Sequence, residues 1–229
     1  LADSARIHRR ASEWWSATGD SDQAIHHAIE AGADDLAGDL LFAAVPEYMT
    51  RGRNATLLGW LERLGERRVA ASPGACLTAA WAELVLGCGP RAEHWAAVAR
   101  RLVAAAERPD DDATMKVGFA LADAALGRDG LAAMRQTIAA AEPLLEEDNP
   151  WRSLSSFLDG VALHLLGDRD AARARLKEGV RRGSVGAPNL QVLSLTQLAL
   201  VAIEQEEWQL AEQELSHARA QIERRRREF

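Results

Sequence analysis

Three seven-residue stretches of this chain share one pattern: WAELVLG at residues 81–87, LADAALG at 121–127 and VALHLLG at 161–167. Each stretch is mostly apolar and ends in glycine, and the three glycines are 40 residues apart. A fourth copy, LVAIEQE at 200–206, has glutamate in place of the glycine. Five residues after the last position of each copy comes an alanine: Ala92, Ala132, Ala172 and Ala211. Recurrence at a fixed period is typical of repeat proteins.

The pattern predicts one helical hairpin in each copy. An apolar helix often ends at glycine, because the next backbone position is left-handed and glycine adopts it without strain. An aspartate after the glycine, as in Gly167-Asp168 and Gly19-Asp20, can cap the following helix. A small alanine then suits the point where the two helices cross. Because one hairpin cannot bury its apolar face alone, we expect an all-α fold, an α-α solenoid of stacked helical hairpins.

Residues 153–180 resemble a tetratricopeptide repeat (TPR). The small positions of that family fall on Gly160, Ala172 and Gly179, and the large position falls on Leu176. The segment 191–218 repeats the pattern with Ala199, Trp208, Ala211, Leu215 and Ala218. The resemblance implies a TPR-like right-handed superhelix of about four repeats over residues 73–229, with a period of 39–40 instead of the family's 34. The extra residues fall in breaker-rich segments that we predict to be loops, at 108–112, 146–150 and 183–188.

The first third of the chain is also predicted to be helical. Helical spacing of apolar residues and turn signals between them predict helices at 4–18, 22–30, 34–50 and 54–64. Pro46 lies inside the third of these, so we expect a kink or break there. The tryptophans outside the repeated heptapeptide are predicted to pack between helices: Trp14, Trp15, Trp60, Trp95, Trp151 and Trp208.

The composition indicates a folded, acidic chain. Of its 229 residues 48% are hydrophobic, and 27 lysines and arginines against 34 aspartates and glutamates give a net charge of −7. Nucleic-acid binding depends on basic side chains that neutralise phosphates, so we expect no direct nucleic-acid binding, and we interpret the basic run at 224–227 as a solvated helix end. Two cysteines and the lack of a long apolar stretch predict a cytoplasmic protein with no membrane contact. The first residue is leucine, and we expect a fragment of a longer protein.

Residues 6–32, RIHRRASEWWSATGDSDQAIHHAIEAG, resemble the segment that follows the winged-helix domain in large ATP-dependent LuxR-type regulators of the MalT kind. That family has His-Arg-Arg-Ala, an aromatic pair, a glycine turn and then Glu-Ala-Ile-x-His-Ala-x-x-Ala-Gly, and Gln23 stands here where glutamate is common. Less specific similarity continues at 51–53, 57–61 and 72–86. The resemblance implies a helical arm at 1–72, after a winged-helix domain, and sensor repeats at 73–229.

The same resemblance implies a function. Such regulators carry a nucleotide-binding switch, a winged helix, a helical-repeat sensor and a LuxR-type helix-turn-helix, and effector binding helps to release an ADP-held resting form. We therefore expect an effector-sensing, protein-interaction domain whose partners are a small-molecule effector or a regulatory protein, the other domains of the parent regulator, and further copies of itself.

No Gly-x4-Gly-Lys-Ser/Thr phosphate loop and no DNA-reading helix-turn-helix occurs in the sequence. We therefore expect no cofactor in this chain, with ATP or ADP bound elsewhere in the parent protein. The alternative is a stand-alone TPR adaptor that binds a peptide or protein partner. The predicted groove lacks the lysine or arginine clamp that such adaptors often carry, and this disfavours the alternative.

Catalytic and metal-binding motifs are missing from the sequence. The six histidines do not form a His-Glu-x-x-His pair, and Gly183-Ser-Val-Gly186 lacks the spacing of a nucleophile elbow. We expect neither an enzyme nor a metal site.

The first helix of each TPR-like hairpin lines the concave groove of the family. Transferring its groove positions to this sequence gives a mostly apolar surface with a few polar groups, as in many small-molecule sites. The predicted ligand-binding residues are Trp81, Leu84, Leu121, Phe157, His164, Thr196 and Glu204. The alternative for each is packing between neighbouring hairpins.

Overall fold

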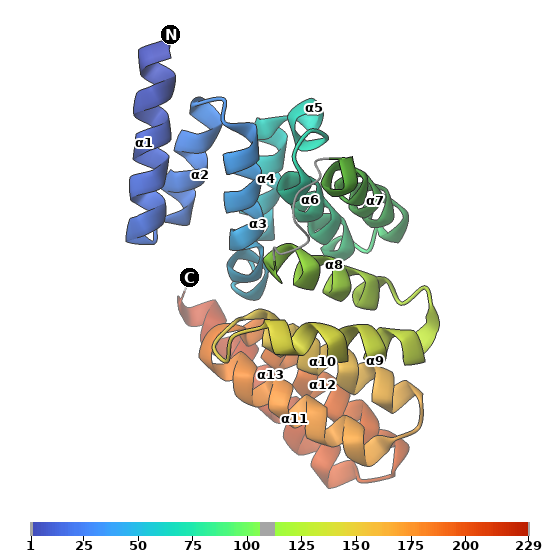
Figure 1. The fold of residues 1–229 in the computed structure, drawn as a ribbon. Coiled ribbons are helices and arrows are strands. Elements are labelled where there is room, and N and C mark those ends of the chain that lie inside the picture. The colour runs from blue at the N-terminus through green and yellow to red at the C-terminus, as the bar shows by residue number, and fades with distance from the viewer. Residues whose placement is uncertain (1, 106–112, 229) are drawn as a thin grey trace. The chain divides into compact units, whose positions relative to one another are not determined.

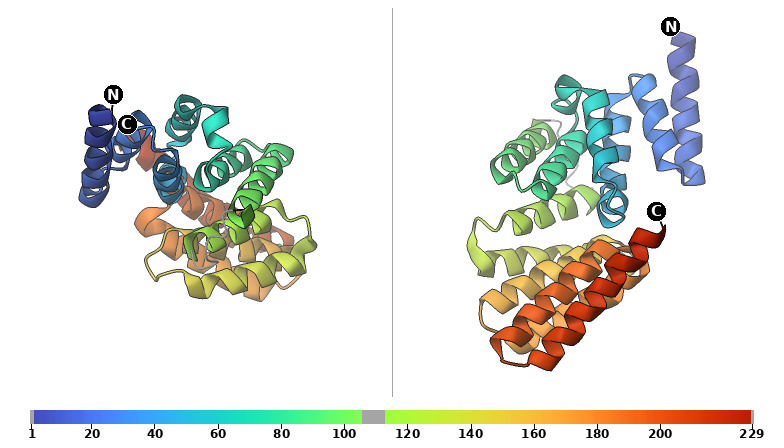
Figure 2. Two further views of the ribbon diagram at one scale, coloured as in Figure 1. Left: turned by 45° about the horizontal axis from the view of Figure 1, so that its top comes forward. Right: turned by 180° about the vertical axis from the view of Figure 1, so that it is seen from behind.

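Every regular element among the described residues is a helix. The computed structural model describes residues 2–105 and 113–228, and its secondary structure consists of α-helices and one short 3-10 helix (Figure 1). Figure 2 shows the same coils and connections from two further sides. The predicted all-α class is confirmed.

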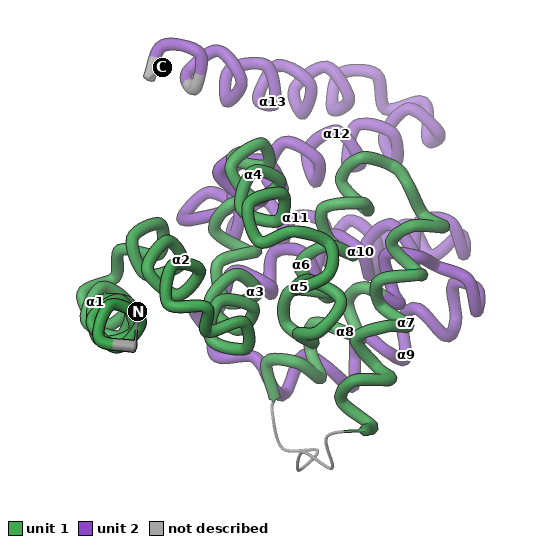
Figure 3. Tube along the Cα trace, turned by 90° about the horizontal axis from the view of Figure 1, so that it is seen from above, with its two compact units in different colours: residues 1–48, 53–122 green, residues 49–52, 123–229 purple. Residues whose placement is uncertain are grey.

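The helices belong to two compact units (Figure 3). Unit 1 comprises residues 1–48 and 53–122, and unit 2 comprises residues 49–52 and 123–229. The predicted boundary between arm and sensor at residue 72 concerns function and stays a prediction.

Unit 1 contains helices α1 to α7 and most of α8. Their bounds are α1 (Ala2–Thr18), α2 (Ser21–Glu30), α3 (Asp34–Thr50), α4 (Asn54–Leu64), α5 (Glu66–Val69), α6 (Pro73–Val85), α7 (Gly89–Ala105) and α8 (Ala113–Leu126). The first four agree with the predicted ranges to within two residues. The carboxylate of Asp20 accepts a hydrogen bond from the backbone N–H of Gln23 (3.0 Å), which is the predicted cap of α2.

Glycines bring α3, α6 and α8 of unit 1 into close contact. A Cβ atom on Gly74 would lie 2.6 Å from the carbonyl oxygen of Gly38, and a Cβ on Gly118 would lie 2.2 Å from Cζ of Phe42. Neither position has room for a larger residue. The largest fully buried side chains of this unit come from several of its helices: Ile25, Leu41, Val45, Tyr48, Leu57, Leu77, Trp81, Val117 and Leu121.

Unit 2 is a series of helices in which neighbours along the chain pack on one another. Their bounds are α9 (Gly130–Ala141), η1 (Glu142–Leu144), α10 (Trp151–Leu165), α11 (Arg169–Gly186), α12 (Pro188–Glu204) and α13 (Trp208–Glu228). Contacts join α9 to α10, α10 to α11, α11 to α12 and α12 to α13. The first helix of one hairpin also contacts the first helix of the next, α10 against α12.

The corners inside three hairpins have the same backbone geometry. Gly87, Gly167 and Glu206 have positive φ angles of 74°, 87° and 60°. In each corner this residue donates its N–H to the carbonyl three residues earlier, and the next residue donates to the carbonyl five residues earlier. These two bonds satisfy carbonyls at the helix end. Glu206 is the only non-glycine residue with positive φ in the described part of the chain, at the position where the fourth copy lacks glycine.

Small residues let the hairpins of unit 2 close. A Cβ on Gly160 of α10 would lie 2.7 Å from Cγ of the fully buried Leu176 in α11, and a Cβ on Gly179 would lie 2.6 Å from Oγ of Ser194 in α12. Ala172 is also fully buried. The small and large positions predicted for residues 153–180 are therefore confirmed.

The second copy departs from the predicted pattern. Gly127 has the expected positive φ of 62°, but α9 begins at Gly130, three residues later, whereas the other second helices begin two residues after the corner. Ala132 is consequently exposed, and Met134 and Ile138 are buried in its place. The prediction that Ala132 packs at the crossing is wrong.

Several local predictions also need correction. The predicted loop at 183–188 is nearly absent, because α11 continues to Gly186 and α12 begins at Pro188. Pro46 does not break α3. Trp14 and Trp208 are exposed, at 58% and 63%, rather than packed. The loop at 146–150 is confirmed, and the predicted loop at 108–112 lies outside the described residues.

The contact at Gly160 can be tested with two glycine-to-alanine substitutions, which we expect to change the free energy of unfolding in opposite directions. Gly160→Ala should lower the free energy of unfolding by about 1–2 kcal/mol, because overpacking outweighs the helix propensity that alanine adds. A Cβ added at Gly59 would meet no atom within 4 Å. Gly59→Ala at this exposed helix position should therefore raise the free energy of unfolding by up to about 1 kcal/mol. Urea unfolding followed by circular dichroism measures both. A Gly160→Ala protein at least as stable as the wild type would contradict the close approach.

The left-handed backbone at Glu206 generates a second prediction. Glu206→Gly should stabilise the chain by about 0.5–1 kcal/mol, because relief of left-handed strain exceeds the extra entropy that glycine loses on folding. Gly167→Ala, at the equivalent corner with no atom near a new Cβ, should destabilise by about 1 kcal/mol. Thermal and urea unfolding check both signs, and a destabilised Glu206→Gly variant would rule this explanation out.

Candidate functional site

A cavity of about 500 Å³ lies in unit 1 among α4, α5, α6 and α7. The short helix α5 follows a turn at Gly65, whose φ is 82°, and it lies between α4 and α6. On α6 the cavity is lined by Ala79, Ala82 and Glu83, which share one face of the helix. The two alanines leave space that the larger side chains of the neighbouring helices enclose.

The wall of the cavity is largely apolar. Trp95 of α7 is buried, and its ring meets the ring of His94 edge-on at 5.4 Å between centroids. Leucine and valine side chains complete the wall from α4 and α5: Leu58, Leu61 and Val69. The cavity therefore offers aromatic and aliphatic surface to a bound molecule.

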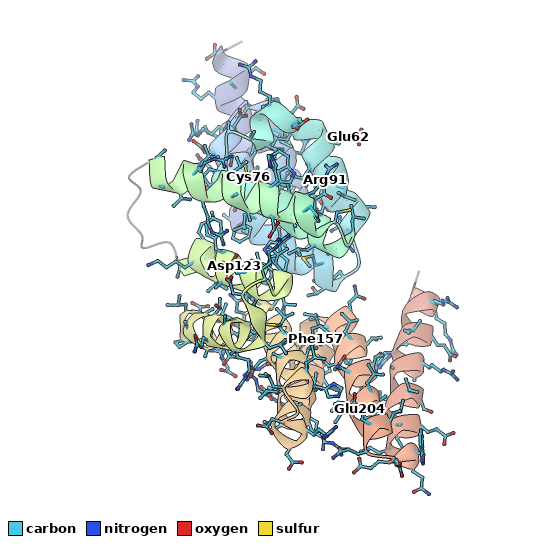
Figure 4. All side chains as sticks on the ribbon, turned by 90° about the vertical axis from the view of Figure 1, so that its right-hand side faces the viewer. Glu62, Cys76, Arg91, Asp123, Phe157 and Glu204 are labelled. Carbon is cyan, nitrogen blue, oxygen red and sulfur yellow. The ribbon has the colours of Figure 1, made fainter. Side chains whose placement is uncertain are left out.

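Carboxylates outnumber cations around this cavity. Glu83 is the only charged residue between Pro73 and Gly87, its side chain is 12% exposed, and its Oε1 lies 2.8 Å from an Nη atom of Arg91. Glu62 and Glu66 also line the cavity, and neither forms an ion pair within the described residues. Figure 4 labels Glu62 and Arg91 on the same side of unit 1. Three carboxylates against one guanidinium favour a ligand with positive charge.

This arrangement suits a small molecule that combines a protonated amine with an apolar body. The apolar body would contact Trp95 and the leucines, and the amine would pair with the carboxylates. A cation near the face of tryptophan is additionally stabilised by the charge distribution of the ring.

The seven residues predicted from the sequence are divided between the two units. Trp81 and Leu121 are buried in unit 1, and Leu84 is half-buried there. In unit 2, Phe157 packs against the apolar cluster of Leu176, Leu198 and Val201. Thr196 is exposed, and its hydroxyl donates to the carbonyl of Val192 (2.9 Å). None of the seven lines the α4–α7 cavity, and their role in ligand binding stays a prediction.

His164 and Glu204 are the two predicted site residues that the structure brings together. Nε2 of the buried His164 lies 3.0 Å from Oε2 of Glu204, and Nδ1 lies 2.7 Å from the side-chain nitrogen of Gln197. The Gln197 amide donates to Nδ1, so Nε2 carries the proton that faces Glu204. This 3.0 Å contact with His164, together with the nearby Arg169, holds the pKa of the Glu204 carboxyl below its usual range. His164 lies on α10 and Glu204 on α12, the first helices of successive hairpins, and Glu204 stands one position further along its copy than His164 does.

A network of partly buried ion pairs joins α9, η1, α10 and α11. Asp159, with 12% of its side chain exposed, lies 2.8 Å from Nε of Arg135 and 2.8 Å from Nε of Arg175. Arg175 also pairs with Glu142, which accepts a hydrogen bond from the Ser155 hydroxyl at 2.8 Å. Each carboxylate has its partners within the network, so we interpret it as structural.

Sequence reasoning did not find the α4–α7 cavity or the ion-pair network. Their residues come from four elements each, and no local pattern indicates that these elements meet. One signal was present: a single glutamate, Glu83, in the otherwise uncharged stretch from Pro73 to Gly87. A buried charge requires a partner, so this glutamate pointed to a polar contact inside unit 1.

Comparison with protein-family models gives no match for this sequence, and comparison with curated proteins gives none either. Among the described residues, none of the helices has both the length and the apolar character needed to span a membrane.

The ion-pair network makes unit 2 sensitive to acid. Burial raises the pKa of Glu142, but hydrogen bonds from Arg175 and Ser155 outweigh it and bring the folded-state pKa below the ordinary 4.5. A lowered folded-state pKa contributes stability above pH 4.5 that is lost as pH falls. The melting temperature of the wild type should therefore drop on acidification below this pH. Glu142→Gln should lower the free energy of unfolding by about 1–2 kcal/mol at pH 7. The melting temperature of this variant should also fall less steeply on acidification than that of the wild type.

Glu146→Gln is the matched control, because Glu146 is exposed and its side chain has no ion pair within the described residues. Its melting profile, measured by circular dichroism between pH 3 and pH 7, should follow that of the wild type. If the melting temperature of Glu142→Gln falls on acidification as steeply as that of the wild type, Glu142 is not a source of the acid sensitivity.

Proposed function

We propose that this chain is the effector-sensing module of a larger cytoplasmic transcription regulator of the LuxR type, with the nucleotide-dependent switch and the DNA-reading domain in other parts of that protein. The observation that carries sensing is the α4–α7 cavity. Its volume of about 500 Å³ falls within the range usual for small-molecule sites, and it combines apolar walls with a few charged groups.

The finer architecture that we propose is a TPR-like right-handed superhelix. Three observations support stacking of similar hairpins: the shared corner geometry at Gly87, Gly167 and Glu206, the buried small residues of α10 and α11, and the contact of α10 with α12. Contact between the first helices of successive hairpins is expected when repeats stack.

The assignment to a LuxR-type regulator rests on the resemblance of residues 6–32. The structure forms helices over this run, α1 and α2, with the glycine turn at Gly19 and the cap at Asp20. These features are consistent with the helical arm that the resemblance implies.

The effector that best fits the cavity is a protonated amine with an apolar body. Glu83 is nearly enclosed, whereas 70% of its partner Arg91 is exposed, so the guanidinium can move aside while the carboxylate stays in place. A ligand ammonium would then take over the contact with Glu83. This exchange would change the interaction between α6 and α7, and effector binding would thereby alter the packing of unit 1.

Thermal-shift screening of the purified chain tests the proposal. Sugars, amino acids, nucleotides, lipids and aromatic or aliphatic amines are compared, because a ligand that binds the folded form raises the melting temperature. We expect an amine to give the largest shift. Glu83→Gln should weaken its binding at least about tenfold, equivalent to about 1.4 kcal/mol, whereas Glu13→Gln on α1 should leave it unchanged.

Three outcomes would count against this function. They are the lack of a shift by any small molecule, a shift that Glu83→Gln does not reduce, and equal losses in the two variants. Tight binding of a peptide without any small-molecule response would favour the adaptor function instead.

A further inference from the structure

Unit 2 contains a second hollow, of about 530 Å³, at the ends of α11 and α12 and beside α13. None of the seven predicted ligand-binding residues lines it. Its polar lining consists of Arg181 and Ser184 from α11, Gln191 from α12, and His217, Gln221 and Arg224 from α13. Three helices thus direct side chains toward one place.

The charges around this hollow are opposite to those of the α4–α7 cavity. Its lining contains no carboxylate, although the chain as a whole has a net charge of −7. Arg224 bonds to the neutral amide of Gln221. Arg181 pairs with Glu178, which does not line the hollow and which also pairs with Arg182; Arg182 is paired in addition with Glu147. The hollow is therefore electropositive and suits an anion.

Gln191 contributes its side-chain amide to the hollow. This residue is 5% exposed, and within the described part of the chain its side-chain amide has no hydrogen-bond partner. The amide atoms are not sealed in the packed interior, so the small exposed surface of this residue includes its hydrogen-bonding groups. Here the amide lines the hollow, where a bound molecule can reach it.

The backbone explains why Gln191 is held in this position. A Cβ on Gly183 of α11 would lie 2.8 Å from the backbone nitrogen of Gln191, so glycine alone allows α12 to begin so close to α11. Pro188 is the first residue of α12, and no side chain caps the helix start. The N–H groups of that first turn add positive potential beside the hollow.

We propose that this hollow binds a small phosphorylated metabolite. Arg224 and Arg181 neutralise the phosphate, and the amide of Gln191 donates a hydrogen bond to one of its oxygens. Val180 and Pro188 provide apolar surface for the rest of the molecule. Arginines at the end of a helix are ordinarily explained by the helix dipole, but that explanation does not account for polar side chains from three helices that line one hollow. This site is independent of the function proposed above.

Isothermal titration calorimetry on the complete chain tests the site with glucose 6-phosphate, inorganic phosphate and glucose as probes. We expect the phosphate ester to bind with a Kd of about 1 mM or lower, inorganic phosphate to bind more weakly and compete with it, and glucose not to bind. Arg224→Gln should weaken ester binding about tenfold, and Gln191→Leu should weaken it severalfold.

Arg226→Gln is the matched control, because it removes the same charge from an exposed position two residues further along α13 that does not line the hollow. We expect it to change the Kd less than about twofold. Circular dichroism confirms that each variant is folded. The proposal is overturned if the ester does not bind at millimolar concentration, if Arg226→Gln and Arg224→Gln weaken binding equally, or if inorganic phosphate binds as tightly as the ester.

Discussion

The reversal of the chain between paired helices depends on one backbone position with positive φ, occupied by Gly87, Gly167 and Glu206. This position fixes where the second helix begins, two residues later, and so places the alanine five residues after the corner at the helix crossing. The departure of the second copy follows from the same constraint. After Gly127 the chain needs one more residue before α9 begins, and the helix face that is buried changes accordingly. The backbone conformation at the corner therefore accounts both for the regular hairpins and for the departure of the second copy.

Close packing at these crossings determines where binding sites can form. Where Gly160 faces Leu176, or Gly179 faces Ser194, the helices are too close to leave a hollow. The cavity of unit 1 lies beside Ala79 and Ala82, whose small side chains leave space, whereas the hollow of unit 2 lies at the ends of α11 and α12 and beside α13. Their electrostatics also differ from the Asp159 network, in which charges are matched. Unmatched charge around a hollow is a property of binding sites, whereas matched charge stabilises the fold.

The sequence predicts those features that depend on local backbone chemistry. The glycine corners, the caps at Asp20 and Asp168 and the small residues at Gly160 and Gly179 are all confirmed. The exposure of Ala132 and Trp208, and the continuation of α11 through 183–186, were not predicted, because they depend on how far each helix extends after its corner. The α4–α7 cavity requires four elements to meet and has no periodic signature. The stacking of hairpins inferred from the repeat does, however, account for the contact between His164 of α10 and Glu204 of α12.

The two hollows differ in the way in which binding could be transmitted. In the α4–α7 cavity an incoming cation competes with Arg91 for Glu83, so the free and bound forms differ in a contact between α6 and α7. A ligand shifts a conformational equilibrium only through such a difference in interaction between two states. The hollow beside α13 has no comparable contact to exchange, because Arg224 bonds to a neutral amide and Gln191 has no partner within the described residues. A phosphate there would add interactions and stabilise the existing packing of α11, α12 and α13. Of the two sites, the cavity of unit 1 is therefore the one that has the properties of a sensor.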